Sequence, residues 1–172
     1  GYVWGCWVVW SKSRLSGGGM KPFYIFDLDG TLADITHRRW IIEDKDDKQR
    51  WRRFYAACDK DSPNQPVIDL MHALRLTHDV RIWSGRSDEV RDKTVQWLAD
   101  NTRLTSFEID GILTMRREGD YTPDDVLKKS WLDELSDTER RLLCGCFDDR
   151  DRIVKMYREN GVACFQVADG DF

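Results

Sequence analysis

From Pro22 onward, short apolar runs rich in β-branched and aromatic residues alternate with longer amphipathic stretches. This alternation predicts parallel strands joined by crossover helices. The expected strands cover residues 23–26, 80–83, 112–115, 142–147 and 162–167. Helices are expected over 88–101, 124–135 and 149–160, and after Pro66, where apolar residues recur at helical spacing. The fold class is therefore α/β, a Rossmann-like, doubly wound parallel sheet with flanking helices.

Length and charge set broad limits on the molecule. A chain of 172 residues suits one compact domain, and a net charge of −4 argues against a large surface that coats nucleic acid. Basic residues nevertheless cluster locally, which either serves a short anionic substrate or forms a solvated helix face. The cluster consists of Arg38, Arg39, Arg50, Arg52 and Arg53.

The cysteines indicate no disulfide framework. Their number, five, is odd, which suits a reducing compartment, and the cytoplasm is the expected location. Cys144-Gly145-Cys146 lacks the spacing of a metal site and lies in an apolar run. We therefore interpret these thiols as buried and assign them no chemistry.

Residues 1–19 differ in composition from the rest. Residues 1–10 are rich in Trp and Val, Ser16 to Gly19 has the composition of a flexible linker, and Met20 resembles an original start. The apolar run is too short to span a bilayer, so no membrane attachment is expected. We interpret 1–19 as a tag or leader, with a partner-binding peptide as the alternative, and 20–172 as the main domain.

Polar residues follow the predicted strands directly, where ligands of open parallel sheets bind. Asp27 and Asp29 come after the first strand, ahead of Gly30 and Thr31. Carboxylates this close repel one another unless a cation joins them, which favours an oxygen-seeking ion such as Mg²⁺. Beside a metal that neutralises phosphate charge, a carboxylate can act as a nucleophile.

Two further sets follow later strands. Ser84-Gly85-Arg86 offers a hydroxyl, a close backbone and a guanidinium for phosphate oxygens. Asp148-Asp149-Arg150 offers a second acidic pair that could complete a metal site with Asp27. Asp124 and Lys128 lie one helical turn apart, which by itself also permits an ordinary surface ion pair.

In this order the motifs resemble the haloacid-dehalogenase superfamily. Asp27 to Thr31 resembles its Asp-x-Asp-Gly-Thr motif, Ser84 its second motif, Lys128 its lysine motif, and Asp148-Asp149 its acidic motif. From Met20 onward the chain more closely resembles the 3′-phosphatase domain of bacteriophage polynucleotide kinase and its stand-alone relatives. That resemblance is carried by 84–86, 119–120, 124–128 and the tail from 148 to 172.

The resemblance implies catalytic roles. Asp27 would attack phosphorus and form an aspartyl-phosphate, while Asp29 would protonate the leaving oxygen and then activate water. That role needs an Asp29 pKa shifted upward. Ser84 and Lys128 would contact phosphate oxygens, with Asp124 orienting Lys128.

It also implies ligands for the metal and the substrate. Mg²⁺ would take an oxygen of Asp27, the backbone carbonyl of Asp29 and a carboxylate from Asp148 or Asp149. Arg38 and Arg86 would engage the phosphates of a nucleic acid. One further arginine belongs to this set, either Arg116 or Arg117, and we assign Arg117. The predicted substrate-binding residues are Thr31, Arg38, Gly85, Arg86, Arg117 and Asp124.

The stretch 34–66 is expected to form a small helical cap over the site. Its aromatic residues Trp40, Trp51 and Tyr55 either stack on a base or pack within the cap. The sequence contains neither a kinase phosphate loop nor a Gly-x-Gly-x-x-Gly motif, so neither ATP-dependent phosphate transfer nor hydride transfer is expected.

The expected function is therefore a Mg²⁺-dependent phosphomonoesterase acting on a phosphorylated substrate, most simply the 3′-phosphate end of DNA or RNA. One alternative keeps the chemistry but takes small phosphate esters such as nucleoside 5′-monophosphates. A second alternative is a non-catalytic binding module that uses the leader or the cap to hold a partner.

Overall fold

A computed structural model describes residues 19–170, so the predicted leader, apart from Gly19, and the last two residues lie outside the described part. Its centre is a five-stranded parallel sheet in the order β5-β4-β1-β6-β7. The strands are β1 (Phe23–Phe26), β4 (Asp79–Ser87), β5 (Leu113–Arg116), β6 (Leu143–Asp148) and β7 (Cys164–Gln166). The predicted Rossmann-like, haloacid-dehalogenase-like α/β class is confirmed.

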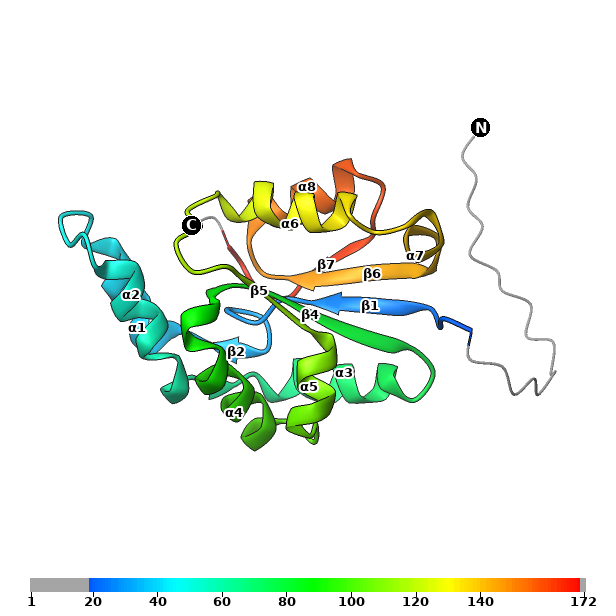
Figure 1. Ribbon diagram of the computed structural model, residues 1–172, viewed down its shortest axis with the longest axis horizontal. Coiled ribbons are helices and arrows are strands. Elements are labelled where there is room, and N and C mark those ends of the chain that lie inside the picture. Colours follow the sequence, from blue (N-terminus) through cyan, green and yellow to red (C-terminus); the bar gives the residue numbers. More distant parts are fainter. Residues whose placement is uncertain (1–18, 171–172) are drawn as a thin grey trace.

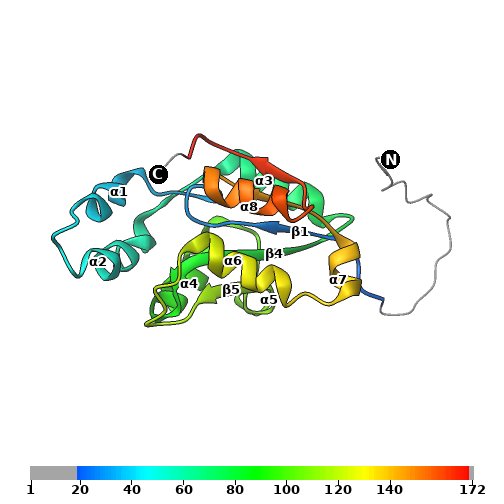
Figure 2. The same ribbon diagram turned by 90° about the horizontal axis from the view of Figure 1, so that it is seen from above.

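Helices cover both faces of the sheet (Figures 1 and 2). One layer consists of α3 (Gln65–Arg75), α4 (Arg91–Asn101), which follows the short turn η2 (Asp88–Val90), and α5 (Ser106–Ile112). The other consists of α6 (Asp124–Asp133) and α8 (Asp151–Glu159), with α7 (Asp137–Leu142) leading into β6. Each crossover helix thus returns the chain to the edge of the sheet where the strands begin, so that all five strands end together at the opposite edge.

The core divides into two layers because neighbouring strand residues face opposite sides of the sheet. Phe26 and Ile82 pack with Met71 of α3 in one layer. Phe23 and Ile25 pack with Ile153 of α8 in the other. Both central strands are therefore buried on both faces, as is usual for parallel sheets.

Several boundaries differ from the sequence-based expectation. The third strand begins and ends one residue later than predicted, and the last strand is shorter, Cys164–Gln166 instead of 162–167. The helices α5 and α7 were not predicted. Each begins with a capping box, built by Thr105 with Glu108 and by Ser136 with Glu139. The hydrogen bonds of the capping box stabilise the start of each helix, although the apolar pattern of each helix is too short to predict it.

The segment 34–66 projects beyond the carboxyl end of β1 (Figure 1). It holds α1 (Thr36–Glu43), α2 (Arg50–Ala56) and η1 (Cys58–Lys60). At its base β2 (Ala33–Asp34) pairs antiparallel with β3 (Ser62–Pro63), a two-stranded sheet that no strand pattern predicted. Ile35, Ile41 and Phe54 give the cap a small core of its own.

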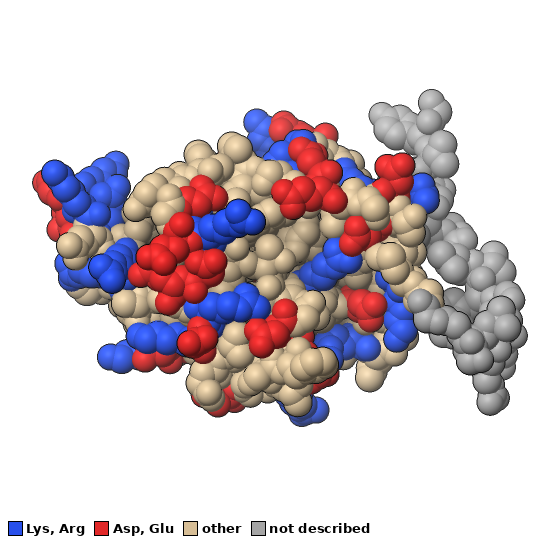
Figure 3. Space-filling model, in the orientation of Figure 1, with Lys and Arg blue, Asp and Glu red and all other residues tan. Residues whose placement is uncertain are grey.

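Charged side chains are unevenly distributed, and lysines and arginines gather over the projecting cap (Figure 3). In the described residues, no helix combines the length and apolarity needed to cross a bilayer.

Candidate active site

The catalytic candidates meet at the carboxyl ends of β1 and β6. Asp27 follows β1 directly, and its backbone N–H still donates to Phe147 O at 2.9 Å, so the strand pairing with β6 continues to this point. Asp148 ends β6 and Asp149 follows it. One carboxylate oxygen from each of Asp27, Asp148 and Asp149 lies within 4.8 Å of the others.

Lys128 reaches into this acidic cluster from α6. Its Nζ donates to Asp27 Oδ1 at 2.6 Å and to Asp148 Oδ2 at 2.7 Å, and the whole side chain is buried. Burial alone would lower the pKa of Lys128, but the neighbouring carboxylates of Asp148 and Asp27 raise it above its ordinary value. Lys128 therefore stays charged and balances part of the negative charge.

The cluster retains the properties of a divalent-cation site. Asp149 Oδ1 is buried and has no hydrogen-bond partner among the described residues. Both oxygens of Asp148 are engaged, Oδ2 by Lys128 and Oδ1 by the Arg150 backbone N–H at 3.1 Å. A buried carboxylate oxygen that accepts no hydrogen bond lowers the stability of the fold unless a cation binds it in place of the missing donor. The donor set fits Mg²⁺, and Asp149 is better suited than Asp148 to be its direct ligand.

Gly30 lets the first loop approach this cluster. It has a φ of +85°, and a Cβ built on it would collide with the Asp149 carboxylate. Glycine meets both demands because it has no side chain and adopts positive φ at little cost.

Burial makes the ionised cluster costly. It raises the pKa of Asp27 well above its ordinary value, against the opposing effect of Lys128, and the charges of Asp148 and Asp149 add to the increase. Burial, followed by the charge of Asp148, raises the pKa of Asp149 to about 7. A bound cation would favour the ionised form of both groups, which is the form that nucleophilic attack by Asp27 requires.

The environment of Asp29 differs from the expectation. Arg38 Nη2 donates to Asp29 Oδ1 at 2.8 Å, and Arg86 Nε donates to the same oxygen at 2.7 Å. Although burial raises the pKa of Asp29, Arg86 and Arg38 outweigh it and lower the pKa below its ordinary value. The expected upward shift is therefore wrong for the protein without substrate.

Asp61, at the base of the cap, was missed by the sequence analysis. Its buried carboxylate accepts from Arg38 Nε at 2.6 Å and Arg86 Nη2 at 2.5 Å, and it lies 2.8 Å from His37 Nε2. Asp61 thus holds both arginines that contact Asp29. Asp61 does not follow a strand of the central sheet. Its place in the site therefore depends on how the segment 34–66 folds back toward the ends of those strands.

We expect Asp61→Ala to destabilise the protein by about 3–5 kcal/mol, because it leaves two buried guanidinium groups without their main shared partner. Chemical denaturation of the wild type and the variant measures this loss. Asp59→Ala is the matched control, since Asp59 is exposed and its nearest cation is Lys93 Nζ at 3.9 Å. Equal stabilities for the two variants would contradict the role assigned to Asp61.

A strand irregularity shapes the predicted phosphate-binding set. The pairing of β4 with β5 shifts between Ser84 and Ser87, which displaces Gly85 and Arg86 from the regular ladder. Ser84 is fully buried, and its Oγ accepts from the Arg86 backbone N–H at 3.2 Å. Thr31 is also buried, and its Oγ1 has no hydrogen-bond partner among the described residues.

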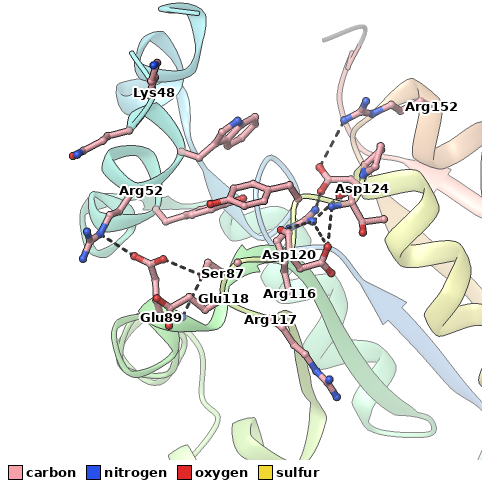
Figure 4. Close-up of a pocket in the computed structure, with 17 residues that line it drawn as sticks. Lys48, Arg52, Ser87, Glu89, Arg116, Arg117, Glu118, Asp120, Asp124 and Arg152 are labelled. Carbon is pink, nitrogen blue, oxygen red and sulfur yellow. Dashed lines mark hydrogen bonds and ion pairs between the residues drawn. The ribbon is translucent and has the colours of Figure 1, made fainter. Parts of the chain in front are cut away.

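Asp124 does not contact Lys128 as expected. Its carboxylate instead forms an ion pair with Arg116, and Arg152 Nη2 lies 3.8 Å away (Figure 4). It also forms an ion pair with Arg150. Lys128 lies one turn further along α6, where it reaches the acidic cluster while Asp124 stays at the start of the helix. The predicted orienting contact is therefore wrong.

The structure also separates the two candidate arginines. Arg116 is buried, and its Nε donates to Gly85 O at 2.9 Å. Arg117 is exposed and points away from Asp124 (Figure 4). Of the pair, Arg116 is thus the one placed beside the predicted phosphate-binding residues, in contrast to our assignment of Arg117.

The predicted residues otherwise come together. Asp27, Asp29, Gly85, Asp124 and Lys128 line one cavity, which Trp51, Phe54 and Tyr55 of α2 close from the cap side. A nucleophile candidate, a charged lysine and a cation site under a small cap define a phosphatase site of the haloacid-dehalogenase type.

The comparisons with known proteins agree with this class. Residues 21–172 match the family model of the polynucleotide kinase PNKP phosphatase domain, and the chain belongs to that family. The chain is thus a phosphatase domain of the haloacid-dehalogenase type.

Solved structures give the same result. The chain superposes on a chain of the Pnkp1/Rnl/Hen1 RNA repair complex with a TM-score of 0.67 and 29% identity, covering 94% of this chain and 48% of that one. The class C acid phosphatase from Bacillus anthracis has a TM-score of 0.62 at 13% identity, covering 91% and 70%. A HAD-family enzyme from Bacteroides thetaiotaomicron, solved with magnesium and inorganic phosphate, has a TM-score of 0.52 at 16% identity, covering 90% and 97%. At these last two identities the likeness concerns the fold.

A match among curated proteins covers part of the chain. The cytochrome P450 monooxygenase adrA from Penicillium rubens is 32% identical over 108 residues, which is 62% of this chain but 18% of that protein. The chain thus spans under a fifth of this relative and about half of the repair-complex chain.

Proposed function

We propose that this domain removes the 3′-phosphate from the ends of polynucleotides, in a Mg²⁺-dependent reaction that passes through a phosphorylated Asp27. The observation that supports it most is the meeting of Asp27, Lys128 and the Asp148-Asp149 pair in one buried cluster. The choice of a polynucleotide rests on membership of the PNKP phosphatase family and on similarity to a chain of an RNA repair complex.

Asp27 and Asp149 would hold Mg²⁺ through their carboxylates, with Asp148 beside them and the backbone carbonyl of Asp29 as a further predicted ligand. When bound, the ion would neutralise charge on the phosphate and on the carboxylates. Lys128 contributes a second fixed positive charge at the same place. It stabilises the negative charge that develops on phosphate oxygens during transfer.

In the first step an oxygen of Asp27 attacks phosphorus, and the bond from phosphorus to the 3′ oxygen breaks. A proton from Asp29 passes to that leaving oxygen. In the second step water attacks the phosphorus, the bond between phosphorus and the Asp27 oxygen breaks, and inorganic phosphate leaves. One proton of the water passes to Asp29, so the Asp27 carboxylate and the protonated Asp29 are both regenerated.

This scheme requires Asp29 to carry a proton when the substrate is bound, and its contacts in the free protein oppose that. Arg38 and Arg86 hold Asp29 ionised in the protein without substrate. A phosphate dianion is a stronger partner for guanidinium groups than a single carboxylate, because it offers more acceptor oxygens and more charge. Substrate binding would therefore draw the arginines toward phosphate, and the pKa of Asp29 would rise as they leave.

Release of inorganic phosphate from one oligonucleotide, phosphorylated at either its 3′ or its 5′ end, tests the proposal. We expect release from the 3′ end at least about tenfold faster than from the 5′ end. Excess chelator should abolish the release and added Mg²⁺ should restore it. Faster release from the 5′ end, or from a nucleoside 5′-monophosphate, would refute the proposed substrate. Full activity in chelator would refute the proposed metal.

A further inference from the structure

A groove continues outward from the catalytic cavity. It lies between α2 of the cap and the loop of residues 117–123 (Figure 4), and its volume is about 490 Å³. That is within the range of sites that bind small ligands. The groove and the catalytic cavity share Trp51, Tyr55 and Asp124 as lining residues, so the two spaces adjoin one another.

Trp51 presents aromatic surface to this groove. Its side chain is 38% exposed, although most large apolar side chains of the domain are buried. It packs edge-on against Phe54, with ring centres 5.9 Å apart at 88°, and lies 6.0 Å from the Tyr55 ring. Tyr55 is fixed in turn, because its hydroxyl donates to Gly85 O at 3.2 Å. The cap thus holds an indole in a fixed position next to the phosphate-binding residues.

The charges around the groove are mixed. Five basic residues line it together with four acidic ones: Lys48, Arg52, Arg116, Arg117 and Arg152, with Glu89, Glu118, Asp120 and Asp124. Part of the positive charge is already balanced, since Arg52 Nε lies 3.5 Å from Glu89 and Arg152 Nη2 lies 3.8 Å from Asp124. A groove that followed a phosphate backbone would need an excess of positive charge. Aromatic surface between balanced charges is better suited to the faces of bases.

We propose that this groove binds the bases next to the terminal phosphate of a single strand, with Trp51 as the stacking platform. The inference rests on the proposed 3′-phosphatase function and specifies its substrate as a single-stranded end. Paired bases are stacked within a duplex, so only unpaired ones can lie against the indole.

The test compares two 3′-phosphorylated single-stranded oligonucleotides of equal length, one intact and one with abasic sites at its last three positions. The wild type should show a higher kcat/KM for the intact strand. Trp51→Ala should lower kcat/KM for the intact strand roughly tenfold or more, the loss expected for a stacking aromatic, and should abolish the preference over the abasic strand. Trp51→Phe should retain most of the preference, because it keeps an aromatic face.

Trp40→Ala is the matched control. Trp40 is a second exposed cap tryptophan, 60% exposed on α1, and it does not line the groove. It should leave the preference unchanged. Equal losses on both strands in Trp51→Ala, or an unchanged preference, would overturn the inference while leaving the 3′-phosphatase function intact. A wild type that releases phosphate from neither strand but hydrolyses small esters would overturn the function and the inference together.

Discussion

Replacing Asp27 with asparagine is expected to abolish phosphate release, with a loss of at least about 10⁴-fold in kcat, because the amide cannot attack phosphorus. Asp27 is the one carboxylate of the cluster that lies at the end of the central strand and also contacts Lys128 at 2.6 Å. The asparagine side chain has nearly the same volume, so the fold should persist. Steady-state assays and circular dichroism measure the two effects.

The same variant distinguishes an enzyme from a binding module. A folded Asp27→Asn protein should still bind a 3′-phosphorylated oligonucleotide, because Arg38, Arg86 and Lys128 remain. Mass spectrometry of the rapidly quenched wild type should detect a phosphate adduct on Asp27, absent from the variant. Residual turnover within tenfold of the wild type would rule out Asp27 as the nucleophile.

Replacing Lys128 with methionine should destabilise the protein by about 3–5 kcal/mol in chelator, because Asp27 and Asp148 then remain buried without their shared cation. The direction in which this loss of stability changes with pH follows from the raised pKa of Asp27. A carboxyl group whose pKa is raised by folding costs stability once pH rises through that pKa. The deficit should therefore shrink as pH falls and the cluster takes up protons. Denaturation across a pH series measures it.

Added Mg²⁺ should recover part of this loss, since an ion that binds only the folded state stabilises it in proportion to the logarithm of its concentration. Lys129→Met is the control, because Lys129 is partly exposed and, within residues 19–170, forms an ion pair only with Asp133 on its own helix. Such pairs contribute about 0.3–0.5 kcal/mol. If the two methionine variants lost equal stability, Lys128 would not be the cation that balances the cluster.

The sequence predicts the sheet and the acidic cluster because both depend on the same rule. Apolar runs mark strands that are buried on both faces, and polar residues directly after them must meet at the carboxyl edge. Asp27 and Asp149 illustrate this, since the 121 residues from 28 to 148 separate these two neighbours at one edge of the sheet.

The contacts that the sequence does not predict come from parts of the chain without such a rule. Asp61 lies at the base of the cap, and its contacts with Arg38 and Arg86 depend on how β2 and β3 pair. Asp124 and Lys128 share a helix, but their spacing cannot reveal that one faces Arg116 and the other faces Asp27. The spacing of residues in the sequence indicates which of them share a face of a helix or strand. It does not indicate which distant charged groups a long, buried side chain contacts.

Arg116 and Arg117 show the same limit at the scale of one residue. Arg116 is the last residue of β5 and Arg117 follows it. Arg116 is buried because its guanidinium contacts Gly85 O and Asp124, two groups that lie outside its own strand. The strand pattern alone therefore cannot decide which of the two arginines belongs to the site.

Anomalous diffraction from crystals of the protein grown with Mn²⁺, a substitute for Mg²⁺, shows directly whether the acidic cluster binds a divalent cation. We expect a single strong peak among Asp27, Asp148 and Asp149, within about 2.5 Å of an oxygen of Asp27 and an oxygen of Asp149. The peak should be absent from Asp149→Ala crystals. Full occupancy by Mn²⁺ elsewhere in the domain, with no density between these carboxylates, would contradict it.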